Sequence, residues 1–491
     1  MKDDTGVLNK DNLKKKSFHA LFWDILGKLA MSGSSFIVTI FLTRLLEPTD
    51  FGLIAIVMVI IGIASVFIDT GLGGALIQRR RVLPIHYSSV FYFNLFIGVL
   101  LSILTYFSAP FIADFYENQE LIPFIEVMSL LFILNSLTLV QSIMLRRELN
   151  NKLLSKVGLI ASVVSGTIGV TFAFFDAGVW SLVLQIFAHG IIYNALLWNS
   201  SRWIPKGFSF KALRQLWGFG FRMFFVALLS TLFDRLDFIV IGKLFTLQIL
   251  GYFERAKSLN FIVVKYTSQS LTSVLFPALS KIQNDLPRLR EVIIKILGIL
   301  TFMIFLFLGE LFLVSEEIVI FLFSAKWIAT IIYFKLLILS SFVHPIGALF
   351  INILSSRGNS KKVLRLVLYR TLFLLVNFYI GFMYGIEEYL YGLILVSILT
   401  LIMQILYVKK ELTISFLELS KPILLQATIA VVSVLIVLLI QRNLLLTGVS
   451  AFLIKSIIFL GSYVLFNYLL KTKSLEYIMI QLDPLIKKIG N

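Results

Sequence analysis

The chain of 491 residues contains no cysteine. This absence excludes disulfide bonds, thiol catalysis and thiolate-bound metals, although it says nothing about the redox compartment. We also find no phosphate-binding loop, no cluster of metal-ligating side chains and no catalytic triad, so ATP-driven and hydrolytic chemistry find no support. The sequence therefore predicts neither a cofactor nor a metal. Charge is scarce too, because Asp, Glu, Lys and Arg make up 14% of the residues, against about 25% in a typical soluble domain.

Apolar residues are what the chain has in abundance. They make up 58% of the sequence and include 46 phenylalanines. Apolar stretches of about 18 residues or more recur along the chain, which indicates transmembrane helices. Lys and Arg outnumber Asp and Glu by 44 to 27. Such an excess can indicate nucleic-acid binding, but in a membrane protein it is typical of cytoplasmic loops and of contact with anionic lipid. We predict an all-α, multi-pass membrane protein that contacts lipid and binds no nucleic acid.

The hydropathy pattern predicts about fourteen transmembrane helices. Their approximate bounds are 18–44, 51–77, 86–110, 121–145, 157–176, 178–199, 214–241, 249–277, 292–313, 328–354, 363–383, 388–408, 421–440 and 446–470. No small-residue cleavage site follows the first apolar run, so we expect that run to be a retained span rather than a signal peptide.

Every second loop between these spans is basic, beginning with "QRRRVLP" at 78–84, whereas most of the other loops are short and acidic or neutral. The positive-inside rule places the basic loops in the cytoplasm. Both terminal tails, 1–17 and 471–491, are then expected in the cytoplasm as well. Arg79, Arg80 and Arg81 are interpreted first as anchors at the cytoplasmic end of the second span.

An internal repeat is visible between the first and seventh spans. "TRLLEPTDFGL" at 43–53 aligns without gaps to "GKLFTLQILGY" at 242–252, an offset of 199 residues that pairs Gly52 with Gly251. Two halves of six spans have the same orientation in the membrane, as parallel repeats require.

The repeat predicts an N-lobe at 18–200 and a C-lobe at 214–410, joined by a cytoplasmic loop at 201–213. Two further helices are expected within 411–470. We expect a central cleft between the two lobes.

Charges inside the predicted spans gather on spans 1, 2, 7 and 8. They are Asp24, Lys28, Arg44, Asp69, Arg222, Asp234, Arg235, Asp237, Glu254, Arg255, Lys257 and Lys265. A charge in the bilayer is costly and normally faces a partner or a wet cavity. These spans are therefore predicted to line the cleft, and its cations suit an anionic substrate.

Each of these charges can instead be an internal ion pair that fixes helix packing. Asp24 and Lys28 lie four residues apart on one helix face, and both interpretations stay open for them. The Asp234–Asp237 segment lies near the outer surface, which favours a structural role. Arg222 and Lys265 have no acid three or four residues away, which favours function. Two single histidines, His189 and His344, are interpreted as packed residues, and Pro345 can interrupt its helix.

Several stretches resemble a known family. They are "FWDILGKLAMSGSSFIVTIFLTRLLEPTDFGLIAI" at 22–56, "FIDTGLGGALIQRRR" at 67–81, "HYSSVFYFNLFIGVLL" at 86–101 and "SVLFPALSKIQ" at 273–283. Together they are similar to Wzx-type polysaccharide flippases of the multidrug/oligosaccharidyl-lipid/polysaccharide exporter superfamily, in the branch related to colanic and teichuronic acid export. Asp24 departs from that pattern, where a small or polar residue is more usual, so Lys28 is not simply a free cation.

The resemblance implies a flippase that moves undecaprenyl-pyrophosphate-linked oligosaccharide repeat units across the bacterial inner membrane by alternating access. We therefore expect a transporter rather than an enzyme. The cleft cations Lys28, Arg222, Lys257 and Lys265 would hold the substrate, and Asp24, Asp69, Asp237 and Glu254 are candidates for coupling or gating. The resemblance also implies a polysaccharide polymerase and chain-length proteins as partners.

Two other classes remain as alternatives. A cation-coupled multidrug exporter of the same superfamily predicts an acid-rich cavity and usually twelve spans, and the buried cations count against it. A membrane enzyme of polysaccharide assembly predicts a large external catalytic loop, whereas the longest external loop predicted here has about 14 residues.

Overall fold

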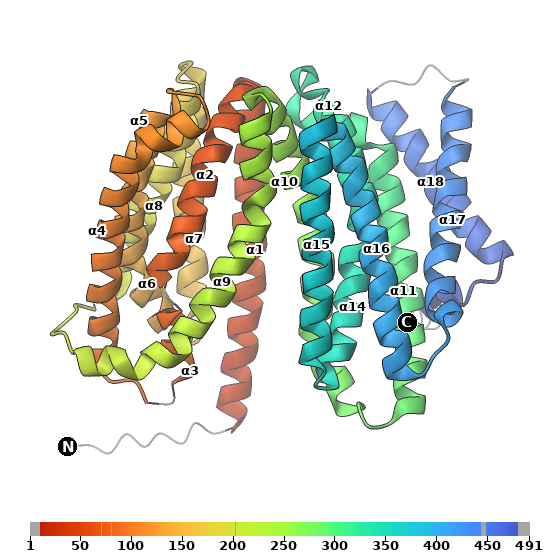
Figure 1. Cartoon of the computed structure of the whole chain (residues 1–491), viewed down its shortest axis with the longest axis horizontal. Coiled ribbons are helices and arrows are strands. Elements are labelled where there is room, and N and C mark those ends of the chain that lie inside the picture. Colours follow the sequence, from red (N-terminus) through yellow and green to blue (C-terminus); the bar gives the residue numbers. More distant parts are fainter. Residues whose placement is uncertain (1–9, 70, 80, 202, 443–447, 480–491) are drawn as a thin grey trace, which may run out of the picture. The chain divides into compact units, whose positions relative to one another are not determined.

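The computed structural model describes residues 10–69, 71–79, 81–201, 203–442 and 448–479, with only the backbone described at some positions, chiefly in α1, α9 and α10. Every regular element in these ranges is a helix, which confirms the predicted all-α class (Figure 1). The chain forms two compact units, Met1–Gly251 and Tyr252–Asn491.

The helices of the first unit are α1 (Lys10–Leu45), α2 (Pro48–Asp69), α3 (Leu72–Gln78), α4 (Pro84–Phe115), α5 (Leu121–Ser129), α6 (Leu131–Arg147), α7 (Asn151–Phe174), α8 (Val179–Ser201) and α9 (Phe210–Leu244). Helix α10 (Leu247–Lys281) begins in this unit and continues into the second. The second unit adds α11 (Leu286–Leu313), α12 (Ser315–Phe323), the 3₁₀ turn η1 (Ala325–Trp327), α13 (Thr330–Ser341), α14 (Val343–Ser356), α15 (Ser360–Tyr384), α16 (Ile386–Leu412), α17 (Phe416–Gln441) and α18 (Gly448–Leu469).

Twelve stretches of the described chain are long and apolar enough to cross a membrane. They correspond in order to predicted spans 1 to 6 and 9 to 14, so this is a multi-pass membrane protein. The seventh and eighth predicted spans fall on α9 and α10, helices of 35 residues each that are not among the twelve. The total of fourteen therefore stays a prediction.

Helix α1 is held against α7 by small side chains. A methyl group on Gly27 would overlap Ser155, and one on Gly158 would overlap Met31. The hydroxyl of Ser155 also donates a hydrogen bond to the carbonyl oxygen of Trp23 at 3.0 Å. Because lipid tails are as apolar as the side chains, helices in a bilayer associate through such close contacts and hydrogen bonds.

The second predicted span, 51–77, is not one continuous helix. Helix α2 ends at Asp69, and the short helix α3 begins at Leu72. Between them Gly71 adopts a left-handed conformation with φ of 68°, and the Asp69 carboxylate accepts a hydrogen bond from the Gly73 amide at 3.0 Å. The side chain of Asp69 thus satisfies a backbone donor at the start of α3, which a helix start would otherwise leave without a partner.

The tenth predicted span is also interrupted. Helix α13 ends at Ser341 and α14 begins at Val343, two residues before Pro345. Proline at this point has no N–H to donate and its ring displaces the preceding turn. The interruption that Pro345 predicted is confirmed.

We predict that Gly71→Ala destabilises the fold. A methyl group at Gly71 would overlap the carbonyl oxygen of Gly220 in α9, and a non-glycine residue in the left-handed region costs about 1–3 kcal/mol by itself. The matched control is Gly218→Ala, because nothing lies within 4 Å of its added methyl group. Thermal unfolding of the purified protein measures both. Equal melting temperatures for Gly71→Ala and the unsubstituted protein would contradict the prediction.

Candidate functional site

The predicted cleft residues are not equally well described. The side chains of Asp24, Arg222 and Lys265 lie outside the described residues, although their backbones belong to α1, α9 and α10. Lys28 is exposed on α1, one position after Gly27, which packs on α7. Lys28 therefore borders the helix face that contacts α7 and does not lie in the packed core.

Asp69 and Arg222 belong to segments that the fold brings together. The α2–α3 turn that holds Asp69 rests on α9, because a methyl group on Gly71 would overlap the backbone of Gly220. Gly220 precedes Arg222 by two residues on the same helix. Two candidate residues from distant parts of the sequence are thus carried by backbones in direct contact, and only glycine at position 71 allows this approach.

The charged segment near the end of α9 faces α2. The guanidinium of Arg235 lies beside Gly62 of α2, where an added methyl group would be 3.5 Å from its Nε atom. It also lies 5.9 Å from the centre of the Phe238 ring. Asp237 accepts a hydrogen bond from the Phe238 amide at 3.0 Å. These contacts agree with the structural role favoured for the Asp234–Asp237 segment.

The candidates on the second unit's part of α10 have close neighbours on their own helix. Glu254 forms an ion pair with Arg255, and their side chains are 21% and 11% exposed. The Lys257 ammonium lies 5.8 Å from the centre of the Phe253 ring. Opposite charges in contact lower the cost of placing either one in the bilayer. Glu254 therefore contributes to local packing, and it also remains a candidate coupling residue.

The starts of α2 and α10 cross with backbone in contact. A methyl group on Gly52 would overlap the carbonyl oxygen of Leu247, and one on Gly251 would overlap that of Pro48. The repeat offset of 199 residues pairs Pro48 with Leu247 and Gly52 with Gly251. The two contacts are therefore equivalent under the repeat. This reciprocity supports the internal repeat and explains why both sequences have glycine there.

An ion pair joins the end of α9 to the α4–α5 loop. The charge pattern of the sequence predicts that both lie on the same side of the membrane as the crossing of α2 and α10. The Lys243 ammonium, at the end of α9, lies 2.6 Å from a carboxylate oxygen of Glu117 in the α4–α5 loop. This hydrogen bond and the positive charge lower the pKa of the Glu117 carboxyl below its ordinary value. The Glu117 carboxyl is therefore ionised at neutral pH, but its side chain is 82% exposed, so water screens the interaction.

At the basic end of the first unit, Gln215 of α9 links two other elements. The Arg79 guanidinium donates to its side-chain oxygen at 2.5 Å, and His86 of α4 lies 3.2 Å from the same oxygen. The other ring nitrogen of His86 accepts from the Leu83 amide at 3.1 Å. Arg79 thus links the end of α3 to α9, and its role as a cytoplasmic anchor stays a prediction. Arg80 lies outside the described residues.

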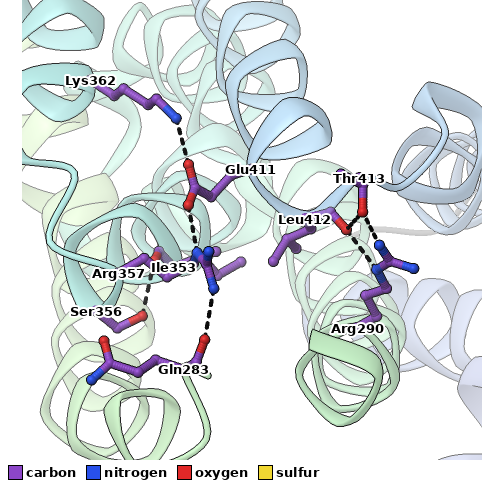
Figure 2. A network of polar contacts seen from close by, with 9 residues as sticks. All are labelled: Gln283, Arg290, Ile353, Ser356, Arg357, Lys362, Glu411, Leu412 and Thr413. Atoms are coloured by element: carbon purple, nitrogen blue, oxygen red, sulfur yellow. Dashed lines mark hydrogen bonds and ion pairs between the residues drawn. The ribbon is translucent and has the colours of Figure 1, made fainter. Parts of the chain in front are cut away.

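A polar clamp joins three basic loops of the second unit (Figure 2). Glu411, at the end of α16, binds both Arg357 and Lys362, and Arg357 also donates to the carbonyl oxygen of Gln283 at 2.7 Å. Arg290 of α11 donates to the carbonyl oxygen of Leu412 at 2.6 Å. The three loops that the positive-inside rule places on one side of the membrane therefore meet one another.

Sequence reasoning missed charged residues on the second unit's other spans. Arg370 is exposed in the middle of α15. Lys335 of α13 lies over the Phe312 ring, and Lys455 of α18 pairs with Glu317 of α12. Each of them interrupts an apolar run in the sequence, but all lie outside spans 1, 2, 7 and 8, on which the predicted cleft charges gather. Among the described residues no group of three or more His, Cys, Asp or Glu side chains could hold a metal.

Comparison with known proteins agrees with the predicted resemblance. Residues 41–332, more than half of the chain, match the family described as "Polysaccharide biosynthesis protein". The chain is 28% identical over 273 residues to the teichuronic acid biosynthesis protein TuaB of Bacillus subtilis (strain 168), covering 55% of this chain and 56% of that protein. It is 24% identical over 348 residues to the lipopolysaccharide biosynthesis protein WzxC of Escherichia coli (strain K12), covering 69% of this chain and 70% of that protein.

The fold is that of a solved flippase. The lipid II flippase MurJ in its inward closed conformation superposes with a TM-score of 0.71 at 17% identity, over 94% of this chain and 100% of that chain. At this level of identity the likeness establishes a shared fold. The chain belongs to the polysaccharide biosynthesis protein family, and the resemblance to Wzx-type flippases is confirmed.

Proposed function

We propose that this protein is a flippase for lipid-linked oligosaccharides, which carries undecaprenyl-pyrophosphate-linked repeat units across the bacterial inner membrane for export of a surface polysaccharide. The family match over residues 41–332 is the observation that carries this proposal. The MurJ-like fold supports it. The activity is inferred for the whole protein although the match with TuaB spans only 56% of that relative.

The substrate's pyrophosphate needs cations in a cleft from which water is largely excluded. Lys28, Arg222, Lys257 and Lys265 are the proposed contacts. The planar guanidinium of Arg222 can donate two parallel hydrogen bonds to phosphate oxygens, whereas a lysine supplies a point charge. Interactions with a doubly charged group are strong in such surroundings because little water screens them. The apolar tail can remain in the bilayer while the head group crosses.

The acids Asp24, Asp69, Asp237 and Glu254 are the proposed coupling or gating groups. Asp69 has the strongest structural argument, because its turn lies on the backbone of α9 close to Arg222. A shift of α9 on substrate binding would act directly on this turn. The bond from the Gly73 amide to the Asp69 carboxylate fixes where the charge of Asp69 lies.

Alternating access also requires a seal that opens. The proposed outer seal is the glycine crossing of α2 and α10, together with the Glu117–Lys243 ion pair. Each of these contacts joins one predicted lobe to the other. An exposed ion pair of this kind is worth about 0–1 kcal/mol, so it can break without a large barrier.

The membrane topology proposed here is the one that the basic loops predict. Both termini and the loop 201–213 lie in the cytoplasm, where the lipid-linked unit is assembled. A polysaccharide polymerase and chain-length proteins on the outer side are the proposed partners, since they would act on the delivered repeat unit.

Substitution of the cleft cations should impair transport without loss of protein. We expect Arg222→Ala and Lys265→Ala to reduce flipping roughly ten- to a hundredfold, the equivalent of one lost charged hydrogen bond. Arg222→Lys should recover only part of the activity. The assay is translocation of a pyrophosphate-linked oligosaccharide lipid by the purified protein in vesicles. Arg214→Ala, an exposed cation on the same helix, is the control. Wild-type rates for both alanine variants would eliminate this anion site.

The topology can be tested independently. Reporter fusions in the loop 201–213 and at both termini should all show a cytoplasmic location, because the basic loops resist translocation. A fusion after Asp176, in the loop between α7 and α8, should report the opposite side. An external location for the 201–213 fusion would overturn the span assignment and, with it, the assignment of the outer seal.

Cross-linking tests the seal in a chain that has no cysteine of its own. With Glu117→Cys and Lys243→Cys combined, a short bifunctional thiol reagent should stop flipping, and a cleavable reagent should allow recovery after reduction. The control pair is Asp114→Cys with Gln119→Cys, whose native side chains lie 2.6 Å apart within one predicted lobe. Its cross-link should leave flipping intact. Full activity of the cross-linked Glu117–Lys243 pair would show that this contact need not open.

A further inference from the structure

Two pairs of polar side chains join α18 to α11 and α12, and none of the four residues belongs to the proposed cleft. The Lys455 ammonium donates to a carboxylate oxygen of Glu317 at 2.5 Å. The neighbouring Ser456 hydroxyl donates to an oxygen of Glu310. Two adjacent residues of one helix thus bind two glutamates from the other two helices, within stretches apolar enough to span the membrane or next to them.

These groups are withdrawn from water. The side chains of Lys455 and Glu317 are 5% and 11% exposed. The second carboxylate oxygens of Glu310 and Glu317 are both buried, and neither has a hydrogen-bond partner among the described residues. Leu313 lies one helical turn from Glu310, and Phe459 lies one turn from Ser456; both are buried in the apolar core of these helices. Each carboxyl group therefore has one oxygen bound and one oxygen buried without a hydrogen-bond partner among the described residues.

The charges of the cluster do not balance if both acids are ionised. The four side chains carry one ammonium and two carboxyl groups, and the ammonium contacts Glu317, so an ionised Glu310 would leave one negative charge without compensation. An uncompensated charge in apolar surroundings is far more costly than a neutral polar group, and such groups neutralise instead. A bound proton makes the cluster neutral, because it converts one carboxylate into an uncharged carboxyl group with an O–H.

We infer that the cluster is a proton-binding site in which Glu310 holds the proton and Glu317 stays ionised opposite Lys455. The Lys455 ammonium contacts the Glu317 carboxylate, so these two opposite charges offset each other. Among the described residues, the hydrogen-bond partner of Glu310 is the neutral hydroxyl of Ser456, which carries no charge to stabilise a carboxylate.

The other charged side chains on the neighbouring elements do not neutralise the second glutamate. Lys335 of α13 lies 5.6 Å from the centre of the Phe312 ring, and among the described residues it forms no ion pair with either glutamate. Glu316 is exposed on α12 and carries negative rather than positive charge. Lys326 lies on η1, beyond the end of α12.

The site links proton binding to the docking of α18. Loss of the proton would place a negative charge between α11 and α18, beside the contact of Phe459 with Gly309. Farther along α18, the Tyr463 hydroxyl still holds the helix to the Phe302 carbonyl oxygen at 3.0 Å. We therefore expect proton release to loosen the end of α18 near Lys455 while the rest of the helix stays in place. This inference does not depend on the substrate proposed above.

Infrared difference spectroscopy of the full-length protein tests the site, because a protonated carboxyl group has a carbonyl band that a carboxylate lacks. At neutral pH we expect such a band in the unsubstituted protein, its loss in Glu310→Gln and its retention in Glu316→Gln, the exposed control. Ser456→Ala should keep the band and shift its frequency, since it removes the hydrogen bond to Glu310. The Ser456→Ala shift remains informative even where Glu310→Gln folds poorly.

Folding yield and thermal stability provide the second readout. Glu310→Gln should melt near the wild-type temperature, because it replaces a neutral group by another. Glu317→Gln should lower yield and melting temperature, since it leaves the Lys455 ammonium buried alone, and adding Lys455→Met should restore both.

The inference is overturned by any of three results. The first is that no band exists at neutral pH. The second is that the band disappears in Glu317→Gln with Lys455→Met but survives in Glu310→Gln. The third is that sodium ions abolish the band, which would identify a metal-cation site instead.

Discussion

Charge in a bilayer must find a partner within the protein, and this constraint shapes most of the polar contacts described here. The Arg147 guanidinium donates to the carbonyl oxygen of Leu76, and Lys455 is buried against Glu317. In water such groups would be solvated and their pairing would matter little. In hydrocarbon an unmet polar group costs several kcal/mol. The helices are therefore positioned by a small number of polar contacts as much as by their apolar faces.

Glycine residues allow the helix backbones to approach one another closely. Apolar attraction alone does not drive helices together in lipid, so van der Waals contact at short range has to do so. Gly27 and Gly158 allow α1 to lie on α7, and Gly71 allows the α2–α3 turn to rest on α9. Of these, only Gly71 also needs the left-handed conformation. At Gly27 and Gly158 the absence of a side chain is enough to explain glycine, because neither position requires a backbone conformation special to glycine.

The sequence predicted the helical class and twelve of the spans well, because long apolar runs have one stable form in a membrane. It failed where a contact joins distant segments. A search three or four residues along a helix finds Asp24 beside Lys28, but it cannot find Arg357 beside Glu411 or Lys455 beside Glu317. The end of α2 at Asp69 was missed for a related reason, since the apolar run continues through Gly71 and only the backbone geometry shows the turn.

The reciprocal crossing of Gly52 and Gly251 has a consequence for how the two halves of the chain can diverge. Each glycine meets a backbone carbonyl oxygen of the other segment, and a carbonyl is common to every amino acid. No substitution at Pro48 or Leu247 can move that oxygen to admit a larger residue. Each of the two positions must therefore remain glycine whatever side chain the opposite segment carries. Correlated substitutions among homologues will then not reveal this contact, even though it joins segments almost two hundred residues apart.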